Sequence, residues 1–173
     1  DEAIAEEFTK RVVEKSKTLK QGDPRDLETD VSALITRKHF ETIDGFVERA
    51  KADGATVLTG GGPNTELGGL FYEPTILADC PEGSEILTEE VFGPVLTIET
   101  FSGDDEGVAK ANDTRFGLAA TLVTSDPERA EKVSAQLRAG TVWVNCFFVR
   151  DLGAPFGGSG QSGIGREGGI WSF

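Results

Sequence analysis

Apolar residues recur at helical spacing in the first third of the chain. Over residues 2–20 they alternate with charged residues, which predicts an amphipathic helix that ends at Gly22-Asp23-Pro24. The same periodicity over residues 36–53, followed by Gly54, predicts a second helix, because glycine commonly follows the last helical residue.

The rest of the chain alternates short apolar strands with helical segments. Helical connections between strands favour a parallel sheet, because a parallel return needs a long crossover. Asp126-Pro127 is typical of a helix start, where Asp accepts hydrogen bonds from free amides. We therefore predict an α/β fold with a mainly parallel sheet and flanking helices. The expected strands cover residues 55–59, 71–77, 95–101, 118–124 and 140–145, and the expected helices cover residues 104–112 and 127–139.

Composition narrows the possible partners. The 173 residues fit one domain, and a hydrophobic fraction of 38% is enough for one buried core. A net charge of −13 repels nucleic-acid phosphates and anionic lipid, and no apolar run is long enough to span a bilayer. We therefore expect a cytoplasmic protein without a nucleic-acid or membrane partner. The chain opens inside a helical pattern and closes on apolar residues, so we also expect it to be truncated at both ends.

Few residues are suited to bind a metal. Cys80 and Cys146 lie far apart without the spacing of zinc ligands, and His39 is the single histidine. We therefore predict no metal site and two unpaired cysteines. Cys146 ends a predicted strand but has no nearby histidine, which favours an inert, buried cysteine over a nucleophile. For His39 we expect a packing or surface position.

The loop that follows the last predicted strand is a candidate ligand site. Ligands of open α/β sheets bind beyond the carboxyl ends of the strands. Phe147 and Phe148 are suited to line an apolar pocket there, and Arg150 is suited to clamp a carboxylate. The alternative is that the aromatic residues belong to the core and that Arg150 pairs with Asp151.

Two further motifs have competing interpretations. Gly158-x-Gly160-x-x-Gly163 matches a dinucleotide fingerprint, but no strand precedes it and no helix follows, so we predict a turned loop. The adjacent Glu89 and Glu90 suit acid/base chemistry or binding to sugar hydroxyls, but such pairs also occur on solvated helix ends.

Three stretches in this order resemble the aldehyde dehydrogenase superfamily. They are TEEVFGPV at 88–95, GTVWVN at 140–145, and PFGG at 155–158 followed by SGIGRE at 162–167; NDTRFGL at 112–118 lies between the first two. The resemblance covers almost the whole chain. It implies that residues 1–173 are the C-terminal portion of the catalytic domain.

The resemblance assigns roles to five positions. It implies that Glu90 holds the nicotinamide-side ribose hydroxyls of NAD or NADP and that Phe92 packs beside the nicotinamide. It places Asn145 and Phe148 at the border of the aldehyde pocket, with Phe156 in its wall. We expect these residues to converge with the Arg150 loop at the carboxyl edge of one shared parallel sheet.

The loop NCFFVRDL at 145–152 is most similar to hydroxymuconic and aminomuconic semialdehyde dehydrogenases of aromatic degradation. Their substrates carry a carboxylate, which makes Arg150 a candidate substrate anchor. The resemblance implies oxidation of a small-molecule aldehyde to a carboxylic acid by a complete enzyme that is a homo-oligomer.

The family's nucleophile stands in a G-Q-x-C context, and this sequence contains no such segment. The family's catalytic glutamate and oxyanion asparagine are also expected upstream of Asp1. We therefore expect no catalytic residue within the chain and no activity from the chain alone. Two alternatives stay open: a stand-alone structural or interaction module without the chemistry, and a protein that binds nucleotide with the glycine-rich loop.

Overall fold

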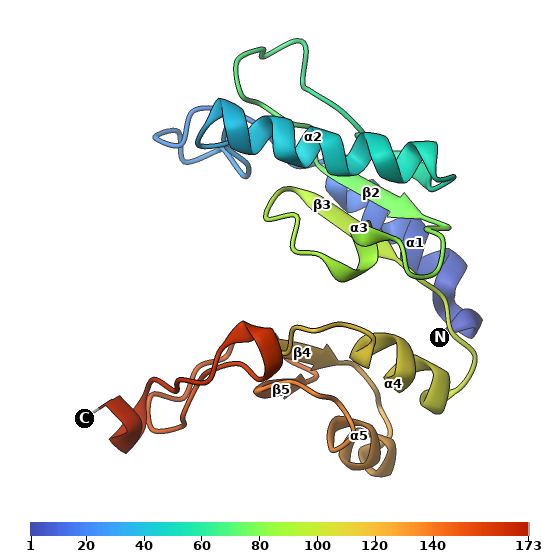
Figure 1. Ribbon diagram of the computed structural model, residues 1–173, viewed down its shortest axis with the longest axis vertical. Helices are drawn as coiled ribbons and strands as arrows, with labels where there is room; N and C mark the ends of the chain where they lie inside the picture. The colour runs from blue at the N-terminus through green and yellow to red at the C-terminus, as the bar shows by residue number, and fades with distance from the viewer. Residues whose placement is uncertain (173) are drawn as a thin grey trace. The chain divides into compact units, whose positions relative to one another are not determined.

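The chain divides into two units in the computed structural model, which describes residues 1–172. Unit 1 runs from Asp1 to Phe101, and unit 2 begins at Ser102 (Figure 1). Each unit has its own small sheet, so the strands form two sheets where we expected one shared sheet. Within residues 1–172, none of the helices combines the length and the apolar character needed to cross a bilayer.

Unit 1 holds two long helices and a three-stranded sheet. Its helices are α1 (Glu2–Lys17), α2 (Arg37–Ala52) and the short α3 (Glu85–Thr88). Its strands are β1 (Thr56–Thr59), β2 (Thr75–Ala78) and β3 (Val95–Ile98), in the order β1-β2-β3. β2 and β3 are parallel as predicted, whereas β1 runs antiparallel to β2, since a loop without a helix joins these two strands.

Side-chain caps fix where both long helices begin. A carboxylate oxygen of Asp1 accepts from the amide of Ala3 at 2.9 Å, and the hydroxyl of Thr36 accepts from the amide of His39 at 3.1 Å. α2 matches its predicted range, but α1 ends at Lys17, earlier than residue 20.

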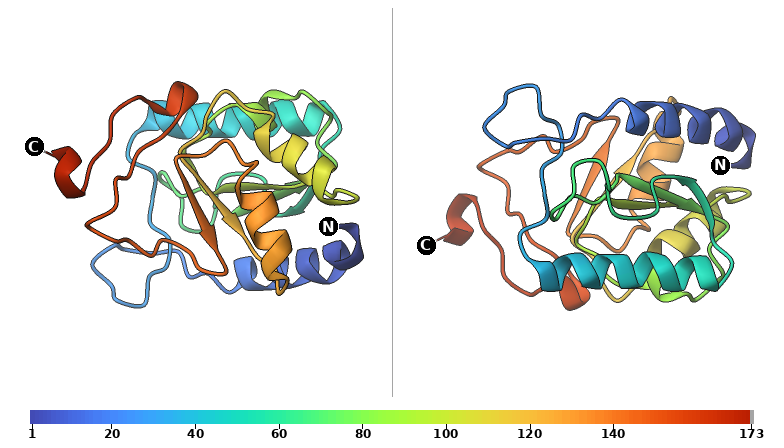
Figure 2. Two further views of the ribbon diagram at one scale, coloured as in Figure 1. Left: turned by 90° about the horizontal axis from the view of Figure 1, so that it is seen from below. Right: turned by 90° about the horizontal axis from the view of Figure 1, so that it is seen from above.

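The core of unit 1 lies between α2 and the sheet. Figure 2 shows α1 and α2 on opposite faces of the sheet. Four side chains on one stripe of α2 are buried and pack with residues of and around β2 and α3. These four are Phe40, Ile43, Val47 and Ala50, and they pack with Tyr72, Leu77 and Ile86.

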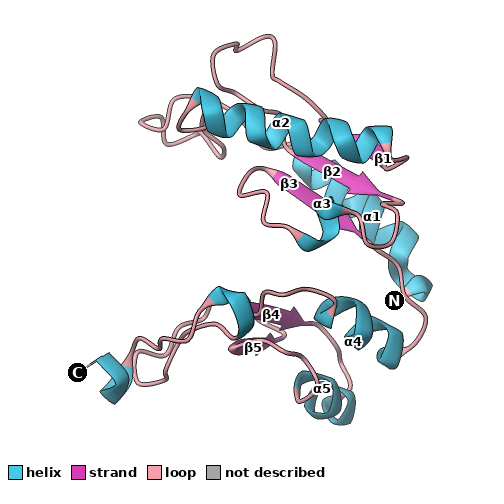
Figure 3. Ribbon diagram, in the orientation of Figure 1, coloured by secondary structure: helices cyan, strands magenta, loops and turns pink. Residues whose placement is uncertain are grey.

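Unit 2 contains two helices and a two-stranded parallel sheet (Figure 3). The elements are α4 (Asp104–Asn112), β4 (Ala119–Leu122), α5 (Pro127–Ser134) and β5 (Thr141–Val144). This is the predicted order of strand and helix, although α5 stops at Ser134 instead of continuing to residue 139. The 3-10 turns η1 (Gly160–Ser162) and η2 (Gly169–Ser172) follow.

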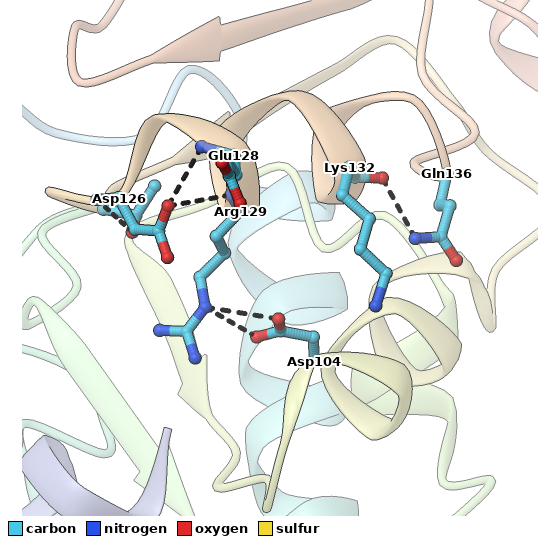
Figure 4. A network of polar contacts seen from close by, with 7 residues as sticks. Asp104, Asp126, Glu128, Arg129, Lys132 and Gln136 are labelled. Atoms are coloured by element: carbon cyan, nitrogen blue, oxygen red, sulfur yellow. Dashed lines mark hydrogen bonds and ion pairs between the residues drawn. The ribbon is translucent and has the colours of Figure 1, made fainter.

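Two kinds of side-chain contact fix the start of α5: hydrogen bonds within its own first turn and an ion pair with α4 (Figure 4). One carboxylate oxygen of Asp126 accepts from the amides of Glu128 and Arg129, at 2.9 and 3.1 Å. The Arg129 guanidinium pairs with Asp104 at 3.2 Å, which joins the first turns of the two helices. The Asp-Pro start expected from the sequence is confirmed, and it orients the crossover between β4 and β5.

Candidate functional site

Glu90 and Phe92 lie on the segment that leads from α3 into β3. Both side chains are exposed, and that of Phe92 keeps 76% of its accessible surface. Among residues 1–172, the Glu90 carboxylate has no hydrogen bond or ion pair. An exposed and unengaged carboxylate is available to accept hydrogen bonds from two neighbouring hydroxyls.

The backbone of Phe92 is held from α2. Its φ angle of 55° lies in the left-handed region, which is unusual for an aromatic residue. The Nε2 of His39 lies 2.8 Å from the Phe92 carbonyl oxygen, and because a carbonyl only accepts, this nitrogen donates. The two rings also meet edge to face at 6.0 Å. His39 is a packing residue as expected, but its support of Phe92 was not anticipated.

Gly93 follows Phe92 and packs directly on α2. A Cβ atom added there would lie 2.5 Å from Cδ1 of Ile43, whose side chain is fully buried. The close contact with the Ile43 side chain favours glycine at this position. α2 therefore fixes the position of the Glu90–Gly93 segment through His39 and Ile43.

A groove of about 690 Å³ lies in unit 1 between α1 and the strands β2 and β3. Its lining is mainly apolar, and no motif in the sequence predicted it. The lining includes Phe8, Val12, Leu19, Pro94 and Leu96.

In unit 2, the aromatic residues after β5 gather around one buried tryptophan. Trp143 is 8% exposed, and its indole N–H donates to the carbonyl of Val149 at 2.9 Å, which holds the loop against β5. The rings of Phe147 and Phe148 lie 5.8 and 5.9 Å from the Trp143 ring. Both phenylalanines are largely exposed, so the alternative that they belong to the core is wrong.

Arg150 pairs with Glu167 and not with Asp151. Its Nη2 lies 3.0 Å from Oε1 of Glu167, and its guanidinium carbon lies 4.1 Å from the centre of the Phe156 ring. The carboxylate of Asp151 accepts instead from the amide of Gly153. The structure thus brings together two predicted site residues, Arg150 and Phe156. It adds Glu167, which ends the SGIGRE motif and for which the sequence indicated no partner.

Asn145 joins the ends of β4 and β5. Its side-chain oxygen accepts from the amide of Thr124 at 2.9 Å, and its side-chain nitrogen donates to the Thr124 carbonyl at 2.8 Å. Its backbone also adopts a φ angle of 55° at the point where the loop leaves the strand. The side-chain amide of Asn145 therefore holds the start of the loop in place. Its position at the border of the aldehyde pocket stays a prediction.

The glycine-rich loop is tightly packed against its own backbone. A Cβ atom on Gly157 would lie 2.2 Å from the carbonyl oxygen of Gly165, and Nη1 of Arg166 donates to the Gly158 carbonyl at 2.6 Å. The segment forms a single 3-10 turn, η1, with no α-helix to receive a pyrophosphate. The predicted loop is confirmed.

Both cysteines are free, as expected. Burial raises the pKa of the Cys80 thiol, whereas Cys146 is exposed, so the expectation of a buried Cys146 is wrong. Within residues 1–172, no three histidine, cysteine or carboxylate side chains gather as a metal would require.

Comparison with known sequences identifies relatives over the whole chain. The model of the aldehyde dehydrogenase family matches residues 1–173. A betaine aldehyde dehydrogenase of Brucella anthropi is 43% identical over 96% of this chain and 35% of its own length. A 2-aminomuconic semialdehyde dehydrogenase of Danio rerio is 41% identical over 100% of this chain and 37% of its own. The chain therefore spans about a third of the length of these relatives.

Solved structures agree with the sequence relatives. Betaine aldehyde dehydrogenase of Staphylococcus aureus in complex with NAD+ superposes with a TM-score of 0.91 at 38% identity, over 97% of this chain and 34% of that one. HpcC of Thermus thermophilus gives a TM-score of 0.93 at 39% identity, over 99% and 35%. The order of the motifs, the fold and these matches show that the chain belongs to the aldehyde dehydrogenase family.

Proposed function

We propose that this chain supplies part of the cofactor site and of the substrate site of an NAD(P)-dependent aldehyde dehydrogenase. Family membership supports the reaction class, an oxidation of an aldehyde to a carboxylic acid. Many apolar side chains of this chain are exposed, among them Val149, Leu152 and Ile164. Large apolar areas on a protein surface usually bind another protein segment or a ligand, so this exposure favours a segment of a larger enzyme over a stand-alone module.

Glu90 and Phe92 form the proposed cofactor side. The unengaged carboxylate of Glu90 fits two ribose hydroxyls, and the exposed ring of Phe92 offers a flat apolar surface to a nicotinamide. When bound, the cofactor supplies the hydride acceptor of the reaction. The NAD+ complex of the S. aureus relative favours NAD over NADP.

The main support for the proposed substrate class is the exposed guanidinium of Arg150, which lies on the Phe156 ring. A guanidinium offers paired donors that match a carboxylate. The ring of Phe148 packs on Trp143, as that of Phe156 does, and suits the apolar body of a substrate. We propose a carboxylate-bearing semialdehyde, as in the similar 2-aminomuconic semialdehyde dehydrogenase.

The chemical step needs groups that this sequence does not contain. The family's cysteine context is absent, and unit 2, which carries the exposed Cys146, contains no histidine that could activate it. We propose that the chain alone is inactive and that Asn145, Phe148, Arg150 and Phe156 bind and orient the aldehyde. The complete enzyme is proposed to be a homo-oligomer in the cytoplasm.

Arg150→Ala in the complete enzyme tests the substrate class. Loss of hydrogen bonds to a charged group costs about 1.5–3 kcal/mol, so KM for an acidic semialdehyde should rise roughly 10- to 100-fold. KM for benzaldehyde should change little. Arg25→Ala removes an equally charged but highly exposed arginine and serves as the control. Equal effects of Arg150→Ala on both substrates would refute the assignment.

A further inference from the structure

Phe156 and Glu167 are fixed opposite each other by two backbone hydrogen bonds. The amide of Phe156 donates to the Glu167 carbonyl at 2.7 Å, and the amide of Glu167 donates to the Phe156 carbonyl at 2.8 Å. Side chains of directly opposed residues in an antiparallel pair lie close together on one face. The ring of Phe156 and the carboxylate of Glu167 therefore form one surface with a set geometry.

Arg150 reaches this surface from a different loop and contacts both members. Its guanidinium carbon lies 4.1 Å from the centre of the Phe156 ring, and its Nη2 lies 3.0 Å from the Glu167 carboxylate. An arginine side chain has about 2 kcal/mol of rotamer entropy to lose when it is ordered. The two contacts order the side chain before any ligand arrives, which favours ligand binding.

The contacts leave most of the guanidinium available. Among residues 1–172, its hydrogen bonding to other side chains is confined to Nη2 and Glu167, whereas a guanidinium carries five N–H donors. The Arg150 side chain is still 33% exposed. A ligand carboxylate can therefore approach without displacing Glu167.

We propose that Glu167 is a positioning residue that holds Arg150 in the orientation that binds the substrate carboxylate. This inference rests on the proposed function, because it assumes that Arg150 contacts the substrate. The opposite effect, in which Glu167 repels an acidic substrate, is disfavoured because the Glu167 carboxylate is paired with the Arg150 guanidinium at 3.0 Å, which offsets its negative charge.

The test compares Glu167→Ala, Glu167→Gln and Glu167→Asp in the complete enzyme, with an acidic semialdehyde and benzaldehyde as substrates. The readout is the ratio of KM for the acidic substrate to KM for benzaldehyde. Glu167→Ala should raise this ratio about three- to fivefold, as expected for a partly exposed ion pair of somewhat less than about 1 kcal/mol. Glu167→Asp should do the same, because the shorter side chain fails to reach Arg150. Glu167→Gln should restore the parent ratio to within about twofold, because its amide oxygen still accepts the hydrogen bond.

A double-mutant cycle separates the two proposals. With Arg150 already replaced by alanine, Glu167→Ala should not change the ratio further. If Arg150→Ala raises the ratio while Glu167→Ala and Glu167→Asp leave it unchanged, the positioning role is refuted and the proposed function stands. If Arg150→Ala leaves the ratio unchanged, the proposed function itself fails. A lower ratio for Glu167→Ala would show repulsion and also overturn the inference, and Glu131→Ala on α5 is the matched control.

Discussion

Phe92 is held in a backbone conformation that side chains rarely adopt. A left-handed conformation outside glycine costs about 1–3 kcal/mol and persists only where neighbouring groups impose it. His39 donates to the carbonyl of Phe92, and Gly93 packs on Ile43, so the constraint comes from α2. At the scale of single residues, the proposed cofactor side is thus preorganised by a helix that does not itself carry Glu90 or Phe92.

His39→Ala in the complete enzyme should therefore weaken cofactor binding. Loss of one hydrogen bond of about 1 kcal/mol would raise KM for NAD about fivefold, because Phe92 is released from its conformation. His39→Gln is the matched variant, since its amide N–H can still donate to the same carbonyl, and it should stay closer to the parent value. An unchanged KM for NAD in His39→Ala would show that this hydrogen bond does not order the site.

At the scale of elements, α2 and the segment before β3 must approach closely. Gly93→Ala would place a Cβ atom 2.5 Å from Cδ1 of the buried Ile43, and overpacking of this kind costs about 1–3 kcal/mol. Ile43→Val removes that Cδ1 atom, so the double variant should lose less stability than the sum of the two single variants. Chemical denaturation of the complete enzyme measures the free energy of unfolding of the two single variants and of the double variant. Strict additivity would mean that the clash is relieved elsewhere.

The sequence predicted which segments form helices and which form strands, but it did not predict where every helix ends or how every strand pairs. Helical periodicity located α2 because a glycine follows its last turn, but α5 ends at Ser134, six residues before the next glycine, Gly140. Periodicity alone does not mark a helix end that has no cap signal. The antiparallel pairing of β1 depends on the path of the loop before β2, which carries no regular pattern.

At the scale of the whole molecule, the predicted site residues fall into both units. Glu90 and Phe92 lie in unit 1, and Arg150 and Phe156 meet in unit 2. The motifs identified these four positions. They did not identify Glu167 as a partner of Arg150, because a contact between two irregular loops leaves no periodic signal in the sequence. The exposed state of Cys146 was missed because a position directly after a predicted strand does not show whether neighbouring residues cover the side chain.

The isolated chain should bind NAD only at millimolar concentration or not at all. Glu90 and Phe92 offer contacts to the nicotinamide side alone, and the loop from Gly158 to Gly163 forms a 3-10 turn without the helix N-terminus that holds a pyrophosphate. Calorimetric titration of the 173-residue chain with NAD tests this, and the complete enzyme is the positive control. Micromolar binding by the isolated chain would favour the alternative of a nucleotide-binding protein. Gly160→Ala would then show whether the glycine-rich loop binds the nucleotide, because Gly160 has a positive φ angle and lacks room for a Cβ atom.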